Sequence, residues 1–160
     1  MELIMVKQLQ VKRRALVLAM AAVFPLFATR ESNAGITETG TIEQPEANDD
    51  TSFIARAISM QQQAIESGDQ GYGAVVVRDG KIVGQSPSHV IINKDPTAHA
   101  EMEAIRDAAR RLNSRDLSRC TLYSSSPACP MCEAAAYWAG IERMVYGKSA
   151  SEGGRPQLCG

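Results

Sequence analysis

The chain has 160 residues, of which 44% are hydrophobic and 22% are charged, and its formal net charge is −1. This length favours one domain over two, and the composition is that of an ordinary soluble globular protein. A net charge so close to zero points to no class of binding partner until the chain is divided into segments.

The N-terminal segment has the pattern of a signal peptide. A basic stretch that ends at Arg14 precedes an uncharged apolar run over residues 15–28, and the small residues Ser32 and Ala34 follow. A basic region, a short apolar region and small residues before a cleavage point are typical of secretory signals. The apolar run is short for a membrane anchor, which needs about 20 residues. We expect residues 1–34 to be a signal peptide; an uncleaved anchor or a misassigned start codon is the alternative.

This signal predicts export, with the periplasm as the destination, by the general secretory or the twin-arginine route. Contact with a membrane would then occur only through the N-terminal signal. If this interpretation of the signal is wrong, the protein would be cytoplasmic. The Arg13-Arg14 pair points to the twin-arginine route, but Lys12 stands where that signal usually has Ser or Thr, so the route stays open.

Removal of the signal leaves an acidic body. Residues 1–34 carry five Lys or Arg and two Asp or Glu, so the remainder has 12 basic and 16 acidic residues and a charge of about −4. This balance argues against nucleic acid as the main partner. Asp107 and Asp116 interrupt a group of arginines that could bind nucleic acid, and a solvated helix face is favoured instead. These arginines are Arg106, Arg110, Arg111, Arg115 and Arg119.

Residues 35–50 are predicted to form a flexible acidic linker. The stretch from Glu31 to Asp50 contains six acidic residues, no Lys or Arg and few large apolar side chains. Such a segment cannot bury enough apolar surface to offset the entropy lost on ordering. The folded domain is therefore expected over residues 51–160.

The folded part is predicted to begin with a helix and a hairpin. Apolar residues recur at helical spacing over residues 51–68, and Gly68 suits the position past the end of a helix. Residues 73–85 contain two Val- and Ile-rich runs joined at Asp79-Gly80. This dipeptide tolerates the positive φ angles of a tight turn, so the segment is typical of a β-hairpin.

A second helix, a strand, a third helix and a final strand complete the predicted order. Asp95-Pro96 would start the second helix, with Asp as its cap and Pro at its first position. Cys120 would begin a strand and be buried, residues 130–139 would form the third helix, and residues 143–147 the last strand. The buried stripe of the second helix is predicted to be Met102, Ile105, Ala109 and Leu112. This order indicates an α/β fold with a mixed sheet and helices packed on its faces.

Cys129 and Cys132 are the first candidates for chemistry. They lie three residues apart at the predicted start of a helix, so both side chains can face one point, and the helix N-terminus favours their thiolates. The spacing is compatible with a thiol–disulfide redox pair. It is also compatible with a structural zinc site, although such a site would require another Cys-x-x-Cys or a His pair.

His99 and Glu101 add a third possibility. One histidine and two cysteines make a three-ligand zinc site that leaves a fourth position for water, which is the mark of a catalytic zinc. A nearby carboxylate that does not bind the metal can serve as proton partner for that water. Residues two apart point to opposite sides of a regular helix, so the spacing alone does not show that these two side chains converge.

Two sequence boxes resemble the cytidine deaminase-like superfamily: DPTAHAEMEAIRDAARRL, and CTLYSSSPACPMCEAAAYWAGIERMVYG. Within this superfamily the boxes are most similar to those of bacterial guanine deaminases and related nucleoside deaminases, and tRNA adenosine deaminases share the DPTAHAE box. The resemblance covers roughly Phe53 to Gly147 and includes the hairpin YGAVVVRDGKIVG. It implies a three-layer α-β-α fold with a mixed central sheet.

The resemblance also implies a function and a set of roles. One Zn²⁺ per chain would be held by His99, Cys129 and Cys132, and Glu101 would be the catalytic proton shuttle. The implied reaction is the hydrolytic deamination of a nucleobase or nucleoside, with a guanine-type purine favoured, in a protein that is a homodimer. The alternatives are a tRNA adenosine deaminase, and an exported protein that is non-catalytic or uses its thiols in redox chemistry.

The chain departs from the family pattern in two places. The family usually has Pro directly before its first zinc cysteine, whereas this chain has Ala128, with Pro127 one place earlier. This change is expected to alter the loop and leave the ligands in place. The family also has an Asn after the first hairpin that grips the substrate, and here Ser88 or His89 occupies that place. Trp138 is a further candidate substrate-binding residue, because the family's tryptophan borders the base pocket; core packing is the alternative.

Overall fold

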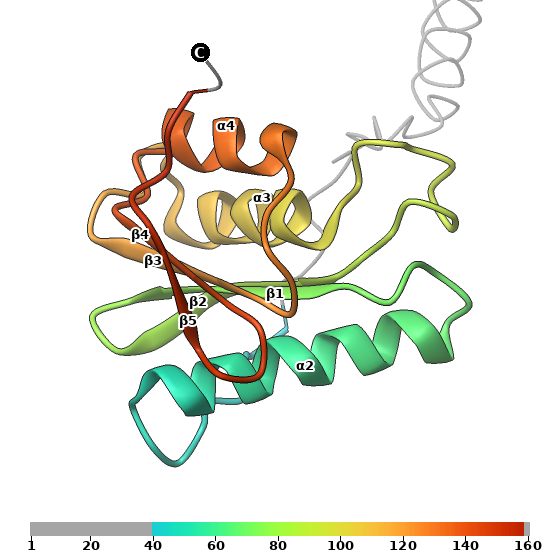
Figure 1. Cartoon of the computed structure of the whole chain (residues 1–160), viewed down its shortest axis with the longest axis horizontal. Coiled ribbons are helices and arrows are strands. Elements are labelled where there is room, and N and C mark those ends of the chain that lie inside the picture. Colours follow the sequence, from blue (N-terminus) through green and yellow to red (C-terminus); the bar gives the residue numbers. More distant parts are fainter. Residues whose placement is uncertain (1–39, 159–160) are drawn as a thin grey trace, which may run out of the picture. The chain divides into compact units, whose positions relative to one another are not determined.

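The structure is a computed structural model, and it describes residues 40–158. The predicted signal peptide, residues 1–34, lies outside the described residues. Within the described range, no helix combines the length and the apolar character that crossing a bilayer requires. The elements, labelled in Figure 1, are α2 (Asp50–Glu66), β1 (Gly73–Arg78), β2 (Lys81–Pro87), α3 (Ala100–Leu112), β3 (Cys120–Ser124), α4 (Pro130–Trp138), β4 (Arg143–Tyr146) and β5 (Ser151–Gly154).

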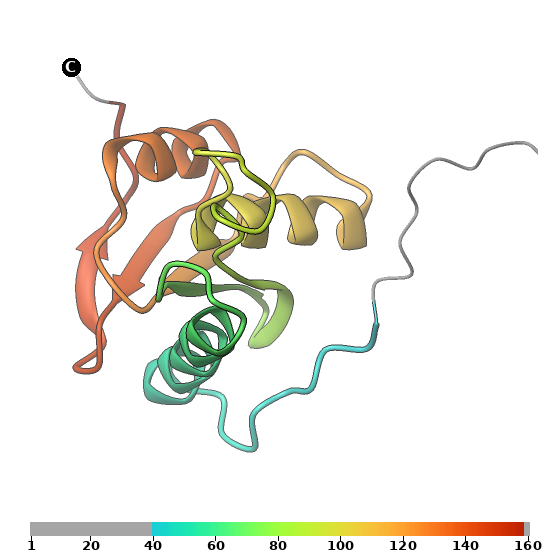
Figure 2. The same ribbon diagram turned by 90° about the vertical axis from the view of Figure 1, so that its right-hand side faces the viewer.

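One five-stranded mixed sheet forms the middle layer of the fold, with the strand order β2-β1-β3-β4-β5. Strands β3 and β4 are parallel, and the other neighbouring pairs are antiparallel. Helix α2 covers one face of the sheet, and α3 and α4 cover the other (Figures 1 and 2). The predicted three-layer α/β fold with a mixed central sheet is therefore confirmed.

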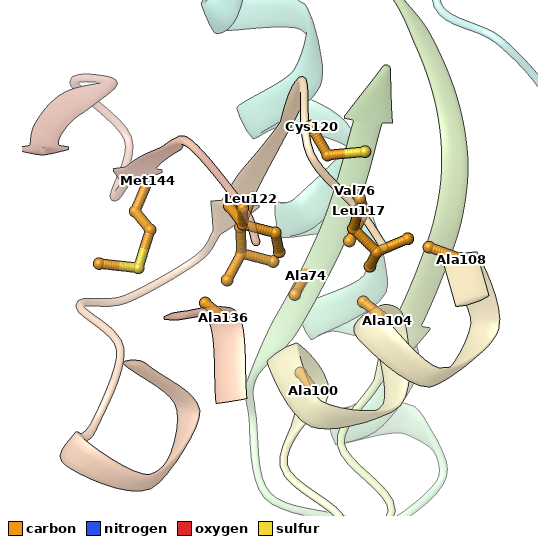
Figure 3. Packing of buried hydrophobic residues seen from close by; sticks show 11 residues of the cluster. Ala74, Val76, Ala100, Ala104, Ala108, Leu117, Cys120, Leu122, Ala136 and Met144 are labelled. Carbon is orange, nitrogen blue, oxygen red and sulfur yellow. The ribbon is translucent and has the colours of Figure 1, made fainter. Parts of the chain in front are cut away.

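The alternation of side chains along the strands divides the core into two clusters. On β1, Ala74 and Val76 face α3 and α4, whereas Val75 and Val77 face α2. Both sets are buried, which explains why this central strand is apolar along its whole length. Figure 3 shows the first cluster, in which side chains of β1 and β3 meet small residues of the two helices. The predicted burial of Cys120 at the start of β3 is confirmed.

Helix α3 lies very close to the sheet because small residues line the contact. A Cβ atom placed on Gly84 of β2 would lie 2.5 Å from the backbone nitrogen of Ala108 and 2.6 Å from the carbonyl oxygen of Ala104. The buried face of α3 consists of Ala100, Glu101, Ala104, Asp107 and Ala108. The predicted stripe of Met102, Ile105, Ala109 and Leu112 is only partly buried. Ile105 and Leu112 pack against the core cluster, but the fully buried contact with the sheet is made by smaller residues that the prediction did not include.

The second helix also begins later than predicted. Residues Asp95 and Pro96 belong to a turn, in which the Asp95 carboxylate accepts hydrogen bonds from the amide and the hydroxyl of Thr97. The helix starts at Ala100, and His99 is its N-cap, with an extended backbone (φ −62°, ψ 153°). The capping chemistry was recognised correctly, but it closes a local turn rather than a helix.

Residues 40–49 differ from the flexible linker expected over residues 35–50. Ile42 is buried in the cluster that packs against α2. Gln44 pairs with Ile82 at the edge strand β2: its side chain donates to the Ile82 carbonyl at 2.9 Å and accepts from the Ile82 amide at 2.7 Å. Asp49 caps α2 by accepting a hydrogen bond from the Ser52 amide at 2.8 Å. One buried apolar side chain and several side-chain hydrogen bonds and ion pairs thus attach this acidic segment to the fold.

The sequence did not predict β5, a short glycine-rich edge strand. Arg143 of β4 explains part of its placement, because its guanidinium contacts Glu152 of β5 at 2.8 Å. The same guanidinium donates two hydrogen bonds to Asp50 of α2, which also accepts one from the Tyr123 hydroxyl. The hydrogen bonds from Arg143 lower the pKa of Asp50 to about 2. These contacts connect the C-terminal strand, the sheet and α2.

Candidate metal centre and active site

His99 and Cys129 occupy equivalent positions at the starts of two helices. His99 is the N-cap of α3 and Cys129 is the N-cap of α4, and both have extended backbone angles. Neither side chain caps the amides of its own helix, which leaves the imidazole and the thiol available for other contacts. Pro130 at the first position of α4 fixes the backbone angle there and needs no amide partner.

The structure brings together His99, Cys129 and Cys132. The Nδ1 atom of His99 lies 3.6 Å from each of the two sulfur atoms, and the sulfur atoms lie 3.6 Å from each other. Tetrahedral zinc with ordinary bond lengths requires about 3.8 Å between two sulfur ligands and about 3.6 Å between sulfur and nitrogen. The three donors therefore have both the chemistry and the separations of a three-ligand zinc site.

The Glu101 carboxyl group lies beside this donor cluster. Its Oε2 atom is 3.7 Å from the sulfur of Cys132, and the residue is only 6% exposed. Because His99 is not yet helical, the i and i+2 side chains can turn to the same side, which a regular helix would not allow. Burial raises the pKa of Glu101 above its ordinary value, which is the direction expected for a group that carries a proton at neutral pH.

The electrostatics of Cys132 favour a bound cation. Burial, and then the neighbouring Glu101 carboxylate, raise the pKa of the Cys132 thiol above its usual range. A thiol in this position would stay protonated unless a positive charge offsets both effects. A divalent metal supplies that charge, since coordination deprotonates a thiol. The same environment opposes the reactive thiolate that a redox pair requires.

A cavity of about 180 Å³ opens onto the donor cluster. Its walls include Glu101 and two residues that the sequence had not marked, Gln70 and Tyr72. The remaining lining residues are His99, Pro127 and Cys129. Only three of the lining residues had been predicted as site residues.

The pairing of β1 with β3 explains how Tyr72 reaches the cavity. In this antiparallel pair Ala74 lies opposite Ser124, so the start of β1 adjoins the end of β3. The Ser125 amide donates to the Gly73 carbonyl at 2.9 Å and continues the pairing into the loop that carries Cys129. The hairpin predicted from the sequence pairs β1 with β2 alone. It does not reveal that β3 is the second neighbour of β1, so local sequence could not place Tyr72 at the site.

The three predicted substrate-binding residues do not line this cavity. Ser88 is fully buried, and its hydroxyl donates to Asp69 at 2.8 Å. His89 is partly buried, with Nδ1 at 3.5 Å from the hydroxyl of Ser86. Trp138 is 73% exposed and lies at the end of α4 opposite Cys129. Nine residues of helix separate these two by about 14 Å.

Ala128, which replaces the usual proline before the first cysteine, packs against the core cluster beneath α3 and α4. Pro127 faces the cavity and also lines a second cavity of about 180 Å³ behind the loop. The three candidate metal ligands come together with this Pro-Ala order in place.

The fold and the donor cluster together define a zinc-binding deaminase domain. The family model described as the cytidine and deoxycytidylate deaminase zinc-binding region matches residues 47–148, and the chain belongs to this family. This match contains both sequence boxes and all four residues of the candidate site.

Relatives with known activities fall into at least two groups. The chain is 41% identical over 95 residues to the guanine deaminase of Bacillus subtilis, and 39% identical over 94 residues to the tRNA-specific adenosine deaminase of Aquifex aeolicus. Each match covers 59% of this chain, and the chain spans 61% and 62% of the length of these relatives. The X-ray structure of the Bacillus subtilis guanine deaminase superposes with a TM-score of 0.58 at 37% identity, over 65% of this chain and 69% of that chain.

Proposed function

We propose that this protein is a zinc-dependent hydrolytic deaminase of a nucleobase or nucleoside, with a guanine-type purine as the favoured substrate. The observation that carries the proposal is the position of Glu101, a buried carboxyl group in contact with a His-Cys-Cys cluster and exposed to a cavity. A deaminase needs a metal site with an open position, a proton carrier beside it and room for a planar base.

In this proposal His99, Cys129 and Cys132 hold the zinc and Glu101 moves protons. Zinc, when bound, supplies a Lewis acid that activates water at its open coordination position. The Glu101 carboxylate accepts a proton from the attacking water and donates it to a ring nitrogen of the substrate. Its Oε atoms then take the second proton from the hydroxyl group now bonded to the ring carbon and give it to the amino group that leaves. Water is consumed, the C–N bond breaks, and an oxo-base and ammonia are formed.

The preference for a guanine-type purine rests on similarity to the guanine deaminase of Bacillus subtilis. A panel of guanine, guanosine, adenine, adenosine, cytosine and cytidine, each incubated with zinc-loaded protein, tests it through ammonia release. Release from guanine or guanosine at the highest rate is expected. If no member of the panel releases ammonia, the proposed activity is contradicted. Release from cytosine or adenine alone would contradict the preference for a guanine-type purine.

Deamination of tRNA adenosine is the second candidate, because the tRNA-specific enzyme of Aquifex aeolicus is nearly as similar. The charges of the described residues weigh against it. Arg106, Arg110 and Arg111 of α3 each pair with an acidic residue of the same helix, which neutralises part of the positive charge that would attract phosphates. If the protein forms inosine in tRNA faster than it releases ammonia from free bases, tRNA adenosine deamination becomes the first candidate. A thiol-redox role is opposed by the raised pKa of Cys132.

We also propose that residues 1–34 direct export to the periplasm and that the deaminase domain includes residues 51–160. The basic stretch, the short apolar run and the small residues of the N-terminal sequence support export. Cell fractionation with sequencing of the mature N-terminus tests this. A shortened chain in the periplasm is expected, and a full-length chain in the cytoplasm would contradict it.

A homodimer is a further part of the proposal. Tyr137 and Trp138 are 45% and 73% exposed, and their rings meet edge to face with centroids 5.7 Å apart. Exposed aromatic side chains are enriched at protein interfaces. Light scattering after size exclusion should give twice the chain mass for the wild type and a larger monomer fraction for Trp138→Ser. A monomeric wild type would contradict the dimer.

A further inference from the structure

Asp69 is a buried carboxylate, 8% exposed, whose oxygens accept four hydrogen bonds. One oxygen accepts from the Ser88 hydroxyl at 2.8 Å and from the Gln70 amide at 2.7 Å. The other accepts from the amides of Ile91 and Ile92, each at 2.9 Å. Burial raises the pKa of Asp69, but the hydrogen bonds from Ile92, Ser88, Gln70 and Ile91 outweigh it and hold the pKa below its ordinary value.

These hydrogen bonds join the loop that forms one wall of the cavity to the loop that leads into His99. The loop before β1 carries Asp69 and supplies Gln70 and Tyr72 to the cavity wall. The loop after β2 begins with Ser88, whose amide donates to the Tyr72 carbonyl at 3.0 Å. A second backbone bond, from the His89 amide to the Ala98 carbonyl at 3.0 Å, connects this loop to the residue directly before His99.

The loop after β2 is folded by its own backbone hydrogen bonds, among them those from Asn93 to His89 and from Asp95 to Val90, and it buries little apolar surface. Ser88 is its single buried residue over positions 88–95, and the large apolar residues Ile91 and Ile92 are 56% and 51% exposed. A segment that buries no apolar side chain is ordered mainly by its hydrogen bonds. The Asp69 carboxylate therefore provides the side-chain contacts between this loop and the cavity wall.

We propose that Asp69 is a positioning residue of the candidate active site: it fixes the wall formed by Gln70 and Tyr72 relative to the segment that leads into His99. The substrate would contact this wall, and Asp69 would act through it without touching the substrate or the metal. The inference rests on the proposed deaminase function, because it assigns that wall to substrate binding.

The variant Asp69→Asn in the full, zinc-loaded chain tests this inference. Asparagine has the same size, but its amide NH₂ faces either the Ile91 and Ile92 amides or the Gln70 amide and Ser88, so one set of bonds is lost. Hydrogen exchange should become at least about tenfold faster at the amides that then face the NH₂ group, either those of Ile91 and Ile92 or that of Gln70, with zinc content unchanged. The KM for the substrate should rise about tenfold or more, with a smaller change in kcat.

Asp49→Asn is the matched control, because the Asp49 carboxylate also accepts a hydrogen bond from a backbone amide, that of Ser52. Asp49 lies on the other face of the sheet, which α2 covers. It should leave exchange at the loop and the KM as in the wild type. Unchanged exchange in Asp69→Asn would overturn the inference, and faster exchange with an unchanged KM would reduce Asp69 to a structural residue. If the wild type releases no ammonia while exchange still rises, the tie between the loops stands and the proposed function fails.

Discussion

The sulfur of Cys132 lies 3.7 Å from the Oε2 atom of Glu101, so a candidate metal ligand and a candidate proton carrier are in direct contact. Both groups are buried, and in the absence of a cation burial and the neighbouring Glu101 carboxylate raise the cost of ionising the Cys132 thiol. A metal held by Cys132, Cys129 and His99 resolves this conflict, because its positive charge stabilises a thiolate and a carboxylate together.

Zinc content should therefore depend on each of the three donors. His99→Ala, Cys129→Ser and Cys132→Ser are each expected to weaken zinc binding at least about tenfold, because two ligands cannot fill a tetrahedral site. Metal analysis after dialysis against a weak chelator measures this, with about one zinc per chain expected for the wild type. Cys120→Ala is the control, since Cys120 is buried in the core away from the cluster. Equal zinc in all four variants would contradict the assignment.

The identity of these donors could be predicted from the sequence, but their convergence could not. His99 and Glu101 share one side because α3 starts at Ala100, and the capping signal at Asp95-Pro96 had placed the start earlier. Both turns and helix starts are favoured by the same residue types, so local chemistry does not distinguish them. The resemblance to deaminases identified the metal site, whereas the helix boundary that makes it possible appeared only in the structure.

The cavity wall was not predictable because it depends on pairing between distant segments. Tyr72 reaches the site through the register of β1 against β3, which local periodicity does not specify. Ser88 shows the opposite case. Its place in the sequence suggested contact with the substrate, but its hydroxyl is bonded to Asp69, a residue that carried no signal of its own.

Gly84 tests the close contact between α3 and the sheet. Gly84→Ala is expected to lower the free energy of unfolding by about 1–3 kcal/mol, because the added methyl group would overlap the backbone of α3. Urea unfolding measures the change. Gly40→Ala is the control, since a Cβ there meets nothing within 4 Å, and a change within about 0.5 kcal/mol is expected. Equal stability of Gly84→Ala and wild type would show that α3 is not packed this closely.

Asp50 should make the protein sensitive to acid. The pKa of Asp50 is about 2 in the folded state, chiefly through Arg143, against about 3.9 for an unfolded chain. Its contribution to stability is thus fully present above the unfolded pKa and is lost as the pH falls toward 2. Since both side chains are 37% exposed, screening reduces this contribution to about 1 kcal/mol.

The variant Asp50→Asn should show that loss at pH 7 and a flatter decline in stability between about pH 4 and pH 2. Urea unfolding at pH 7 and at pH 3 compares it with the wild type. Asp79→Asn is the control, because the Asp79–Arg119 pair is exposed and asparagine tolerates the positive φ of 49° at this turn. A pH dependence identical to that of the wild type would rule out the Asp50–Arg143 pair as a source of acid sensitivity.

Ammonia release by zinc-loaded wild type and by Glu101→Gln, on the best substrate of the nucleobase and nucleoside panel, tests the proposed chemistry most directly. Glutamine keeps the size of the side chain but cannot carry a proton. The variant should retain the zinc content of the wild type and lose about 10²- to 10⁴-fold in kcat. Equal rates in the two proteins, with zinc bound in both, would contradict the role of Glu101 and with it the proposed deaminase mechanism.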